Sequence, residues 1–204
     1  MCNKETISEC IQDVDYIFHF AAYQDYLPDF STYFHVNTVG TALLFECIVE
    51  KSVPIKKVIV ASTQAVMGEG KYSCPIHGNF YPDIRSYKQL ARGDWEIHCS
   101  KCGKGLNKLS DESVVNPQNQ YAMSKYSQEM LALNLGKRYD VPTVCLRYSI
   151  VQGPRQSFYN AYSGAMRIFS LAFHQDKRPI IFEDGEQIRD YVNIFDVVDA
   201  NMLV

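Results

Sequence analysis

Three short apolar runs constrain this chain more than any other feature. They cover residues 14–22, 57–63 and 141–148 and are rich in β-branched and aromatic side chains. Continuous runs of this length are typical of strands buried on both faces of a parallel sheet. Helical patterns at residues 34–51, 121–139 and 165–175 alternate with them. The alternation predicts an α/β fold with a doubly wound parallel sheet, in which ligands bind at the carboxyl ends of the strands.

Length and composition limit the number of domains and the classes of partner. The chain has 204 residues, 47% hydrophobic and 21% charged, which is enough for one well-buried domain and short for two. A net charge of −3, with no basic face, argues against nucleic-acid binding. No apolar run reaches about 18 residues, and the first residues lack an apolar signal segment. We therefore expect a cytoplasmic protein without membrane contact.

A Tyr and a Lys stand four residues apart at the start of the 121–139 helix. Tyr121 and Lys125 therefore project from one helical face, within reach of each other. A free phenol has a pKa of about 10, and a nearby ammonium group lowers it, so that the phenol can take a proton from an alcohol. The same spacing also occurs in ordinary surface pairs, so the surrounding motifs must decide between the two interpretations.

Three of the seven cysteines belong to two short metal-binding patterns. Cys74 and His77 form one Cys-x-x-His pair, and Cys99 and Cys102 form a Cys-x-x-Cys pair; each is followed by Gly. Four such ligands suit tetrahedral Zn²⁺, and because protein fills all four positions, the predicted site is structural. His98 is a weaker substitute for His77, and unligated thiols are the alternative. The other cysteines are expected to be buried free thiols: Cys2, Cys10, Cys47 and Cys145.

Six short motifs lie between residues 19 and 192. They are HFAA at 19–22, NTVGT at 37–41, ASTQAVMG at 61–68, YAMSK at 121–125, LRY at 146–148 with GPRQ at 153–156, and EDGEQIRDYV at 183–192. In this order they resemble the extended short-chain dehydrogenase/reductases, the family of the NAD-dependent nucleotide-sugar epimerases and dehydratases. The resemblance favours a functional origin for the pairing of Tyr121 with Lys125.

The resemblance implies a Rossmann-like sheet that binds NAD. No Gly-x-x-Gly-x-x-Gly loop is present, so the fold is expected to be truncated in its N-terminal half and in its C-terminal substrate domain. A fragment of a longer enzyme and a degenerate homologue would both explain this. The expected organisation is a partial NAD-binding domain at 1–68, a zinc-knuckle insertion at 69–112, and the remainder of that domain with the start of the substrate domain at 113–204.

The resemblance also implies roles for individual residues. Tyr121 would be the catalytic base and acid, and Lys125 would lower its pKa and bind the nicotinamide ribose. Thr63 would be the catalytic hydroxyl, with Ser62 as the neighbouring fallback. Arg189 would bind the substrate diphosphate by paired hydrogen bonds, beside Thr63 and Tyr121. The cofactor would also be bordered or supported by Ala21, Ala22, Asn37, Ser62 and Tyr148.

The two residues after Thr63 bear on the reaction. Dehydratases of the family carry an acidic pair there, whereas this chain has Gln64 and Ala65, which cannot transfer a proton at neutral pH. The resemblance therefore implies 4-epimerisation of a nucleotide-diphosphate sugar. A 4,6-dehydratase or a reductase is a weaker interpretation. A non-catalytic zinc-binding or assembly module is the alternative from a different class.

The insertion narrows the resemblance to members that act as dTDP-L-rhamnose 4-epimerases, and so to dTDP-hexoses. It shares with them the lead-in GEGKY at 68–72, Arg85, and GDWE at 93–96. Two positions depart from the family pattern, because Met67 and Gln152 stand where Tyr is common. At a third, the aliphatic Ile150 replaces an Asn that meets the diphosphate and cannot supply its amide donor. Analogy with the family also suggests a homodimer.

Overall fold

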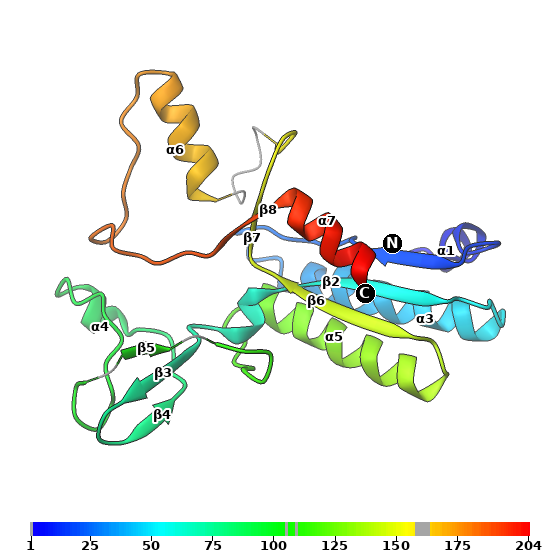
Figure 1. The fold of residues 1–204 in the computed structure, drawn as a ribbon, viewed down its shortest axis with the longest axis horizontal. Coiled ribbons are helices and arrows are strands. Elements are labelled where there is room, and N and C mark those ends of the chain that lie inside the picture. Colours follow the sequence, from blue (N-terminus) through cyan, green and yellow to red (C-terminus); the bar gives the residue numbers. More distant parts are fainter. Residues whose placement is uncertain (1, 105, 109, 158–163) are drawn as a thin grey trace.

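A three-stranded parallel sheet forms the centre of the protein (Figure 1). The computed structural model describes residues 2–104, 106–108, 110–157 and 164–204. The strand order is β1-β2-β6, with β1 at Tyr16–His19, β2 at Lys57–Thr63 and β6 at Thr143–Tyr148. Val60 of β2 lies beside His19 on one side and beside Cys145 on the other. The predicted parallel α/β sheet is confirmed.

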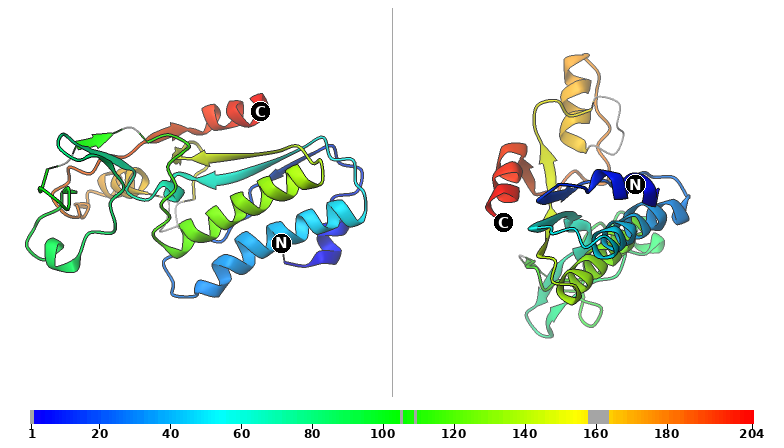
Figure 2. Two further views of the ribbon diagram at one scale, coloured as in Figure 1. Left: turned by 90° about the horizontal axis from the view of Figure 1, so that it is seen from below. Right: turned by 90° about the vertical axis from the view of Figure 1, so that its right-hand side faces the viewer.

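Helices cover both faces of this sheet (Figure 2). On one face α3 (Gly40–Glu50) and α5 (Gln120–Arg138) pack side by side, and α7 (Ile194–Leu203) lies on the other face. Helix α1 (Lys4–Cys10) packs on α3. The segments α2 (Phe30–Tyr33) and η1 (Phe34–Val39), a stretch of π-helix, lead directly into α3. None of the helices in the described residues is both long and apolar enough to cross a membrane.

The hydrophobic core lies between the sheet and the α3–α5 layer. Its buried members include Ile7, Leu44, Phe45, Ile48, Val58, Val60, Ala132 and Val141. Gly136 lets α5 approach β6 closely, because a Cβ at this position would lie 2.4 Å from Thr143 Oγ1. This close packing fixes α5 against β2 and β6.

The insertion folds as a separate small sheet beyond the carboxyl end of β2. After the 3₁₀ turn η2 (Gln64–Met67), its strand order is β4-β3-β5, and all pairs are antiparallel. The elements are β3 (Lys71–Cys74), β4 (Gly78–Phe80), α4 (Tyr87–Leu90) and β5 (Leu106–Lys108). Figure 1 shows this group extending away from the central sheet on the side of the strand ends.

The C-terminal part adds a two-stranded parallel sheet, which also lies at the carboxyl ends of the central strands. Strand β7 (Ile150–Gln152) pairs with β8 (Tyr191–Asn193), which leads into α7. Helix α6 (Ala165–His174) stands apart from the central layers (Figure 1).

The first strand is shorter than expected. It was predicted over residues 14–22 but spans only Tyr16–His19, because the segment that carries Ala21 and Ala22 leaves the sheet. The side chain of Asn37 holds the backbone of Tyr23 in this departing segment. The small residues therefore lie in a loop just past the strand end.

Candidate functional site

The end of β2 separates its two hydroxyl residues onto opposite faces of the sheet. Thr63 is the last residue of the strand, pairs in register with Tyr148, and accepts a hydrogen bond from the Ala65 N–H at 3.2 Å. Ser62 pairs with Arg147 on the other face. Because side chains alternate along a strand, Thr63 lies at the carboxyl end of β2 on the face opposite α5.

The side chain of Ser62 points into the protein interior. Its hydroxyl donates a hydrogen bond to Oε1 of Glu129 on α5, and Ser62 is only 5% exposed. Glu129 in turn accepts two hydrogen bonds of 2.9 Å from the Arg147 guanidinium. The side chain of Ser62 therefore faces α5, and any contact of Ser62 with a cofactor would have to use its backbone.

Helix α5 brings Tyr121 and Lys125 to the strand ends. It begins after Asn119, whose Oδ1 accepts a hydrogen bond from the Ala122 N–H at 2.8 Å, as a typical N-cap does. Tyr121 lies half-buried in the first turn, and Lys125 lies one turn further along and is 2% exposed. The predicted helix and its start are therefore present, with both residues on its inner side.

The ammonium group of Lys125 forms hydrogen bonds with the sheet and with its own helix. Nζ donates hydrogen bonds to the carbonyl of Ala61 at 2.5 Å and to Oε1 of Gln128. Burial lowers the pKa of Lys125 to about 8, although nearby Cys145 and Glu129 act in the opposite direction. The amine thus has less preference for the charged form than an exposed lysine.

A buried polar network, which was not predicted from the sequence, supports Lys125. Gln128 Nε2 lies 2.7 Å from Thr41 Oγ1 and 3.0 Å from His19 Nε2, and His19 Nε2 lies 2.7 Å from Thr41 Oγ1. Burial, and then the charge of Lys125, lower the pKa of His19 to about 4, so the imidazole is neutral. The only available signal was the three-residue spacing of Gln128 from Lys125 on the buried face of α5.

Asn37 joins the loop after β1 to α5. It is fully buried, accepts a hydrogen bond from the Tyr23 N–H at 2.7 Å and donates to the Tyr23 carbonyl at 3.1 Å. It also donates to Ser124 Oγ on α5 at 2.9 Å. Asn37 therefore acts by positioning the loop that carries Ala21 and Ala22.

The remaining predicted residues lie further out. The Tyr148 hydroxyl donates to Oδ1 of Asn201 on α7 at 2.7 Å, and burial raises the pKa of Tyr148. Arg189 is exposed in the irregular segment before β8, where Nη1 donates to the carbonyl of Ile188 at 2.8 Å. Among the described residues, the hydrogen bonds of these two side chains go to Asn201 and Ile188 and not to α5.

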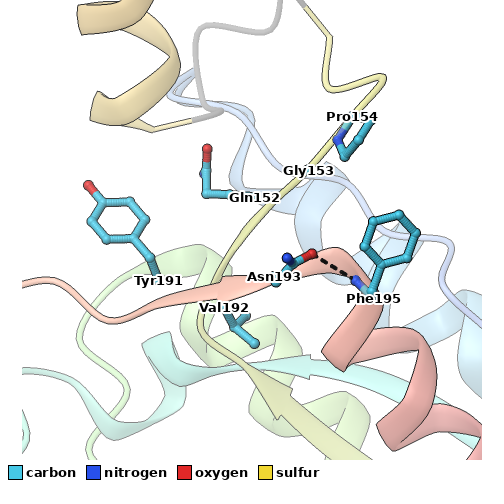
Figure 3. A pocket seen from close by; sticks show the side chains of 7 residues that line it. All are labelled: Gln152, Gly153, Pro154, Tyr191, Val192, Asn193 and Phe195. Atoms are coloured by element: carbon cyan, nitrogen blue, oxygen red, sulfur yellow. Dashed lines mark hydrogen bonds between the residues drawn. The ribbon is translucent and has the colours of Figure 1, made fainter.

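A shallow cavity of about 430 Å³ is lined by the end of β7, the two residues after it, β8 and the start of α7 (Figure 3). Gln152, which stands where the family commonly has Tyr, lines it together with Tyr191 and Asn193. Asn193 is occupied as the cap of α7, because its Oδ1 accepts a hydrogen bond from the Phe195 N–H at 3.0 Å. Gln152 Nε2 is buried and has no hydrogen-bond partner among the described residues.

The four predicted metal ligands come together in the insertion. Their ligand atoms all lie within 4.8 Å of one another; Cys74 Sγ is 3.6 Å from His77 Nδ1 and 3.3 Å from Cys102 Sγ. Cys99 Sγ is 3.5 Å from His77 Nδ1. A zinc tetrahedron with Zn–S bonds of about 2.3 Å has edges of about 3.8 Å. The donor set therefore fits a single zinc ion.

The local backbone favours a metal-binding thiolate at Cys74. Burial raises the pKa of Cys74, but the N–H groups of Ile76 and His77, with the side chains of Cys102 and His77, offset this and lower it to about 6. Gly78 and Gly103 follow the two pairs with φ of 76° and 72°, a conformation that favours glycine. His98 instead pairs with Asp94 at 2.7 Å.

The chain matches the model of the NAD dependent epimerase/dehydratase family over residues 1–89 and 100–204. The dTDP-L-rhamnose 4-epimerase of Burkholderia thailandensis is 31% identical over 177 residues, which are 85% of this chain and 47% of that protein. A UDP-glucose 4-epimerase of Mycolicibacterium smegmatis is 36% identical over 91 residues, which are 45% of this chain and 29% of that protein. The chain spans about half the length of the curated relatives it matches.

Solved structures share the fold. The UDP-glucose 4-epimerase of Thermotoga maritima with UDP-glucose gives a TM-score of 0.74 at 25% identity, covering 99% of this chain and 56% of that one. The UDP-glucuronic acid 4-epimerase of Bacillus cereus in complex with NAD gives 0.69 at 26% identity, covering 96% and 51%. Because the family model matches nearly the whole length of this chain, the chain belongs to the NAD-dependent epimerase/dehydratase family.

Proposed function

We propose that this chain supplies the catalytic base and part of the substrate site of an NAD-dependent nucleotide-sugar 4-epimerase. Family membership and the 4-epimerases among the relatives support this. Because the chain spans about half the length of those relatives, the activity is proposed for the protein that contains it. Family membership also favours an enzyme over the non-catalytic zinc-binding module.

The arrangement at the end of β2 carries the proposal. Thr63 ends the strand, and Tyr121 and Lys125 lie on the first two turns of the helix packed against it. Gln64, at the first of the two positions where dehydratases need acids, accepts a hydrogen bond from Ser149 Oγ at 3.1 Å, and Ala65 has no polar side chain. The site thus offers a base and a cation but no acidic pair, which favours epimerisation over elimination.

The proposed chemistry assigns a role to each of these groups. Tyr121 Oη takes the proton from the C4 hydroxyl of the sugar and later returns it. Lys125, still mostly charged at neutral pH with its pKa of about 8, would stabilise the phenolate form of Tyr121 by its charge and would hold the nicotinamide ribose. Thr63 hydrogen-bonds the same sugar hydroxyl. A bound NAD supplies acceptance and return of the C4 hydride.

The cofactor and substrate contacts extend this assignment. Ala21 and Ala22 would border the cofactor where β1 ends, on the loop that Asn37 holds. Tyr148 and the backbone of Ser62 would complete that border. Arg189, which is exposed, would bind the substrate diphosphate.

The finer parts of the proposal concern specificity and assembly. The 31% relative and the insertion motifs favour a dTDP-hexose. One structural Zn²⁺ at Cys74, His77, Cys99 and Cys102 would organise residues 69–112. This insertion would separate the partial NAD-binding domain at 1–68 from 113–204, which holds the remainder of that domain and the start of the substrate domain. Exposed apolar side chains on the outer side of α5 support a homodimer; they are Met123, Met130 and Leu133.

Replacing the base tests the proposal. Tyr121→Phe should reduce interconversion of dTDP- or UDP-hexose 4-epimers by about 10²- to 10⁴-fold, because only the phenolic proton carrier is removed. The measurement is turnover of the full-length gene product, with bound NAD quantified in the same sample. Tyr139→Phe, at the exposed end of α5, is the matched control and should retain activity. Substantial residual activity of Tyr121→Phe, or release of a 4-keto-6-deoxy sugar, would refute the assignment.

A further inference from the structure

Two contacts in the middle of the insertion, only three residues apart, join it to other parts of the chain that the structure describes. The first is the carbonyl of the buried Pro82, which accepts hydrogen bonds from Asn116 Nδ2 at 3.0 Å and Gln118 Nε2 at 2.7 Å. Asn116 N–H also donates to the Val66 carbonyl at 2.9 Å, beyond the end of β2. This attachment therefore lies immediately before Asn119, the cap of the Tyr121 helix.

The second point is Arg85, which reaches the C-terminal segment. Its Nη1 donates to the Trp95 carbonyl at 2.8 Å and to Oε2 of Glu183 at 3.0 Å. The side chains of Arg85 and Glu183 are only 22% and 19% exposed, so the ion pair is partly shielded from solvent. One guanidinium thus joins the inside of the insertion to a residue almost one hundred positions further along the chain.

Glu183 opens the segment that carries Arg189. It adopts a φ of 57°, which is uncommon for residues other than glycine, and the following turn is closed by the Glu186 N–H donating to Asp184 Oδ1 at 3.1 Å. Arg189 follows six residues after Glu183. The Arg85 ion pair is therefore well placed to hold this turn, and with it the start of the substrate segment.

The other end of the Arg85 contact lies close in sequence to the Cys/His cluster. Trp95 precedes the ligand Cys99 by four residues, and the Gln89 side chain ties the same stretch to α4 through the Glu96 carbonyl at 2.7 Å. Since α4 has no buried residue, the stretch depends on these hydrogen bonds and on the ligand pairs rather than on a core. Loss of the metal would release the carbonyl that orients Arg85.

We propose that Arg85 is a positioning residue. When the insertion is ordered by its metal, Arg85 holds residues 183–189 in place through Glu183 and so fixes the position of Arg189 relative to the Tyr121 helix. The consequence is that the insertion acts on binding of the diphosphate substrate rather than on proton transfer. The role of Arg189 rests on the proposed function, whereas the coupling itself rests on the contacts of Pro82, Arg85 and Glu183.

Hydrogen–deuterium exchange measures the coupling without any substrate. Arg85→Ala should raise exchange within residues 183–189 by about tenfold, because the turn loses its ion pair. Zinc removal with a chelator should do the same in the wild type and add little in Arg85→Ala. The coupling is overturned if Arg85→Ala leaves this segment unchanged, or if zinc removal acts equally in both proteins.

Further variants separate positioning from loss of structure. Arg92→Ala, at an exposed arginine of the insertion, is the matched control and should leave residues 183–189 unchanged. Arg85→Lys should retain part of the protection, because an ammonium group can still donate to the Trp95 carbonyl and to Glu183. If Arg85→Ala loses zinc, Glu183→Gln, outside the insertion, decides by the same criterion.

Kinetics of the full-length gene product then test the consequence. Arg85→Ala should raise KM for the nucleotide sugar with little change in kcat, whereas Tyr121→Phe lowers kcat. An equal loss of kcat in Arg85→Ala would contradict positioning. A catalytically silent protein with intact exchange coupling would refute the proposed function and leave the coupling standing.

Discussion

The two sides of the proposed site are built in contrasting ways. Helix α5, which carries the proposed base, has seven buried residues, and four of them are polar or charged with partners in the sheet, in η1 or α3, or within the helix. On the substrate side, α4 and α6 have no buried residue, and the insertion is held by side-chain hydrogen bonds and a metal-ligand cluster. The proposed base thus lies on the well-packed α5, whereas the proposed substrate contacts lie on segments with little buried surface, which can unfold locally without α5.

The largest predicted effect should be confined to the insertion. Cys99→Ser removes one of four ligands, and because structural zinc binding supplies about 10–16 kcal/mol in small zinc domains, the insertion should lose both its metal and its order. Zinc content and protease sensitivity of residues 69–112 are the measurements. Cys10→Ser, at an exposed cysteine of α1, is the matched control. An unchanged zinc content in Cys99→Ser would refute the proposed metal site.

The next effect should destabilise the rigid part as a whole. Glu129→Ala leaves the Arg147 guanidinium and the Ser62 hydroxyl without their buried partner, so we expect a loss of about 3–5 kcal/mol in the free energy of unfolding. Denaturant unfolding measures it. Glu46→Ala breaks the exposed pair with Lys4 and should cost less than about 1 kcal/mol. Equal costs for the two variants would remove the contrast between the buried and exposed pairs.

A smaller effect should appear as a dependence of stability on pH. In the folded protein the pKa of His19 is about 4, below its usual value of 6.5. Between about pH 4 and 6.5 the unfolded chain therefore binds a proton at His19 that the folded protein does not bind. Stability should be complete above about pH 6.5 and fall by at most about 3 kcal/mol as the pH drops towards 4. His19→Gln should flatten this part of the profile. Parallel profiles for the two proteins would show that His19 is not held neutral.

Local patterns accounted for the fold and for much of the site. The apolar runs predicted the three parallel strands, and the Tyr121 motif predicted a helix that does begin at its Asn cap. The ligand pairs of Cys74 and Cys99 predicted a cluster that the fold brings together across 21 intervening residues. Each of these depends on spacing along one element or on short backbone loops, which the order of residues alone specifies.

Other features required the packed structure. The sequence left Thr63 and Ser62 as alternatives, and the alternation of strand side chains, together with Glu129 on α5, placed them on opposite faces. It likewise gave no sign that Gln128 holds Lys125, because that contact depends on what α5 packs against. The length of β1 was overestimated because Asn37, in a later helix, draws the chain out of the sheet.

The sequence alone determined the parallel α/β architecture and the helix that carries Tyr121 and Lys125, and it predicted the Cys/His cluster, because each follows from periodicity or from short spacings along the chain. Only the tertiary structure decided which hydroxyl faces the strand ends, what stabilises the buried lysine, and how Arg85 reaches Glu183. These depend on side chains far apart in the chain, and their partners are chosen by the packing of whole elements against one another.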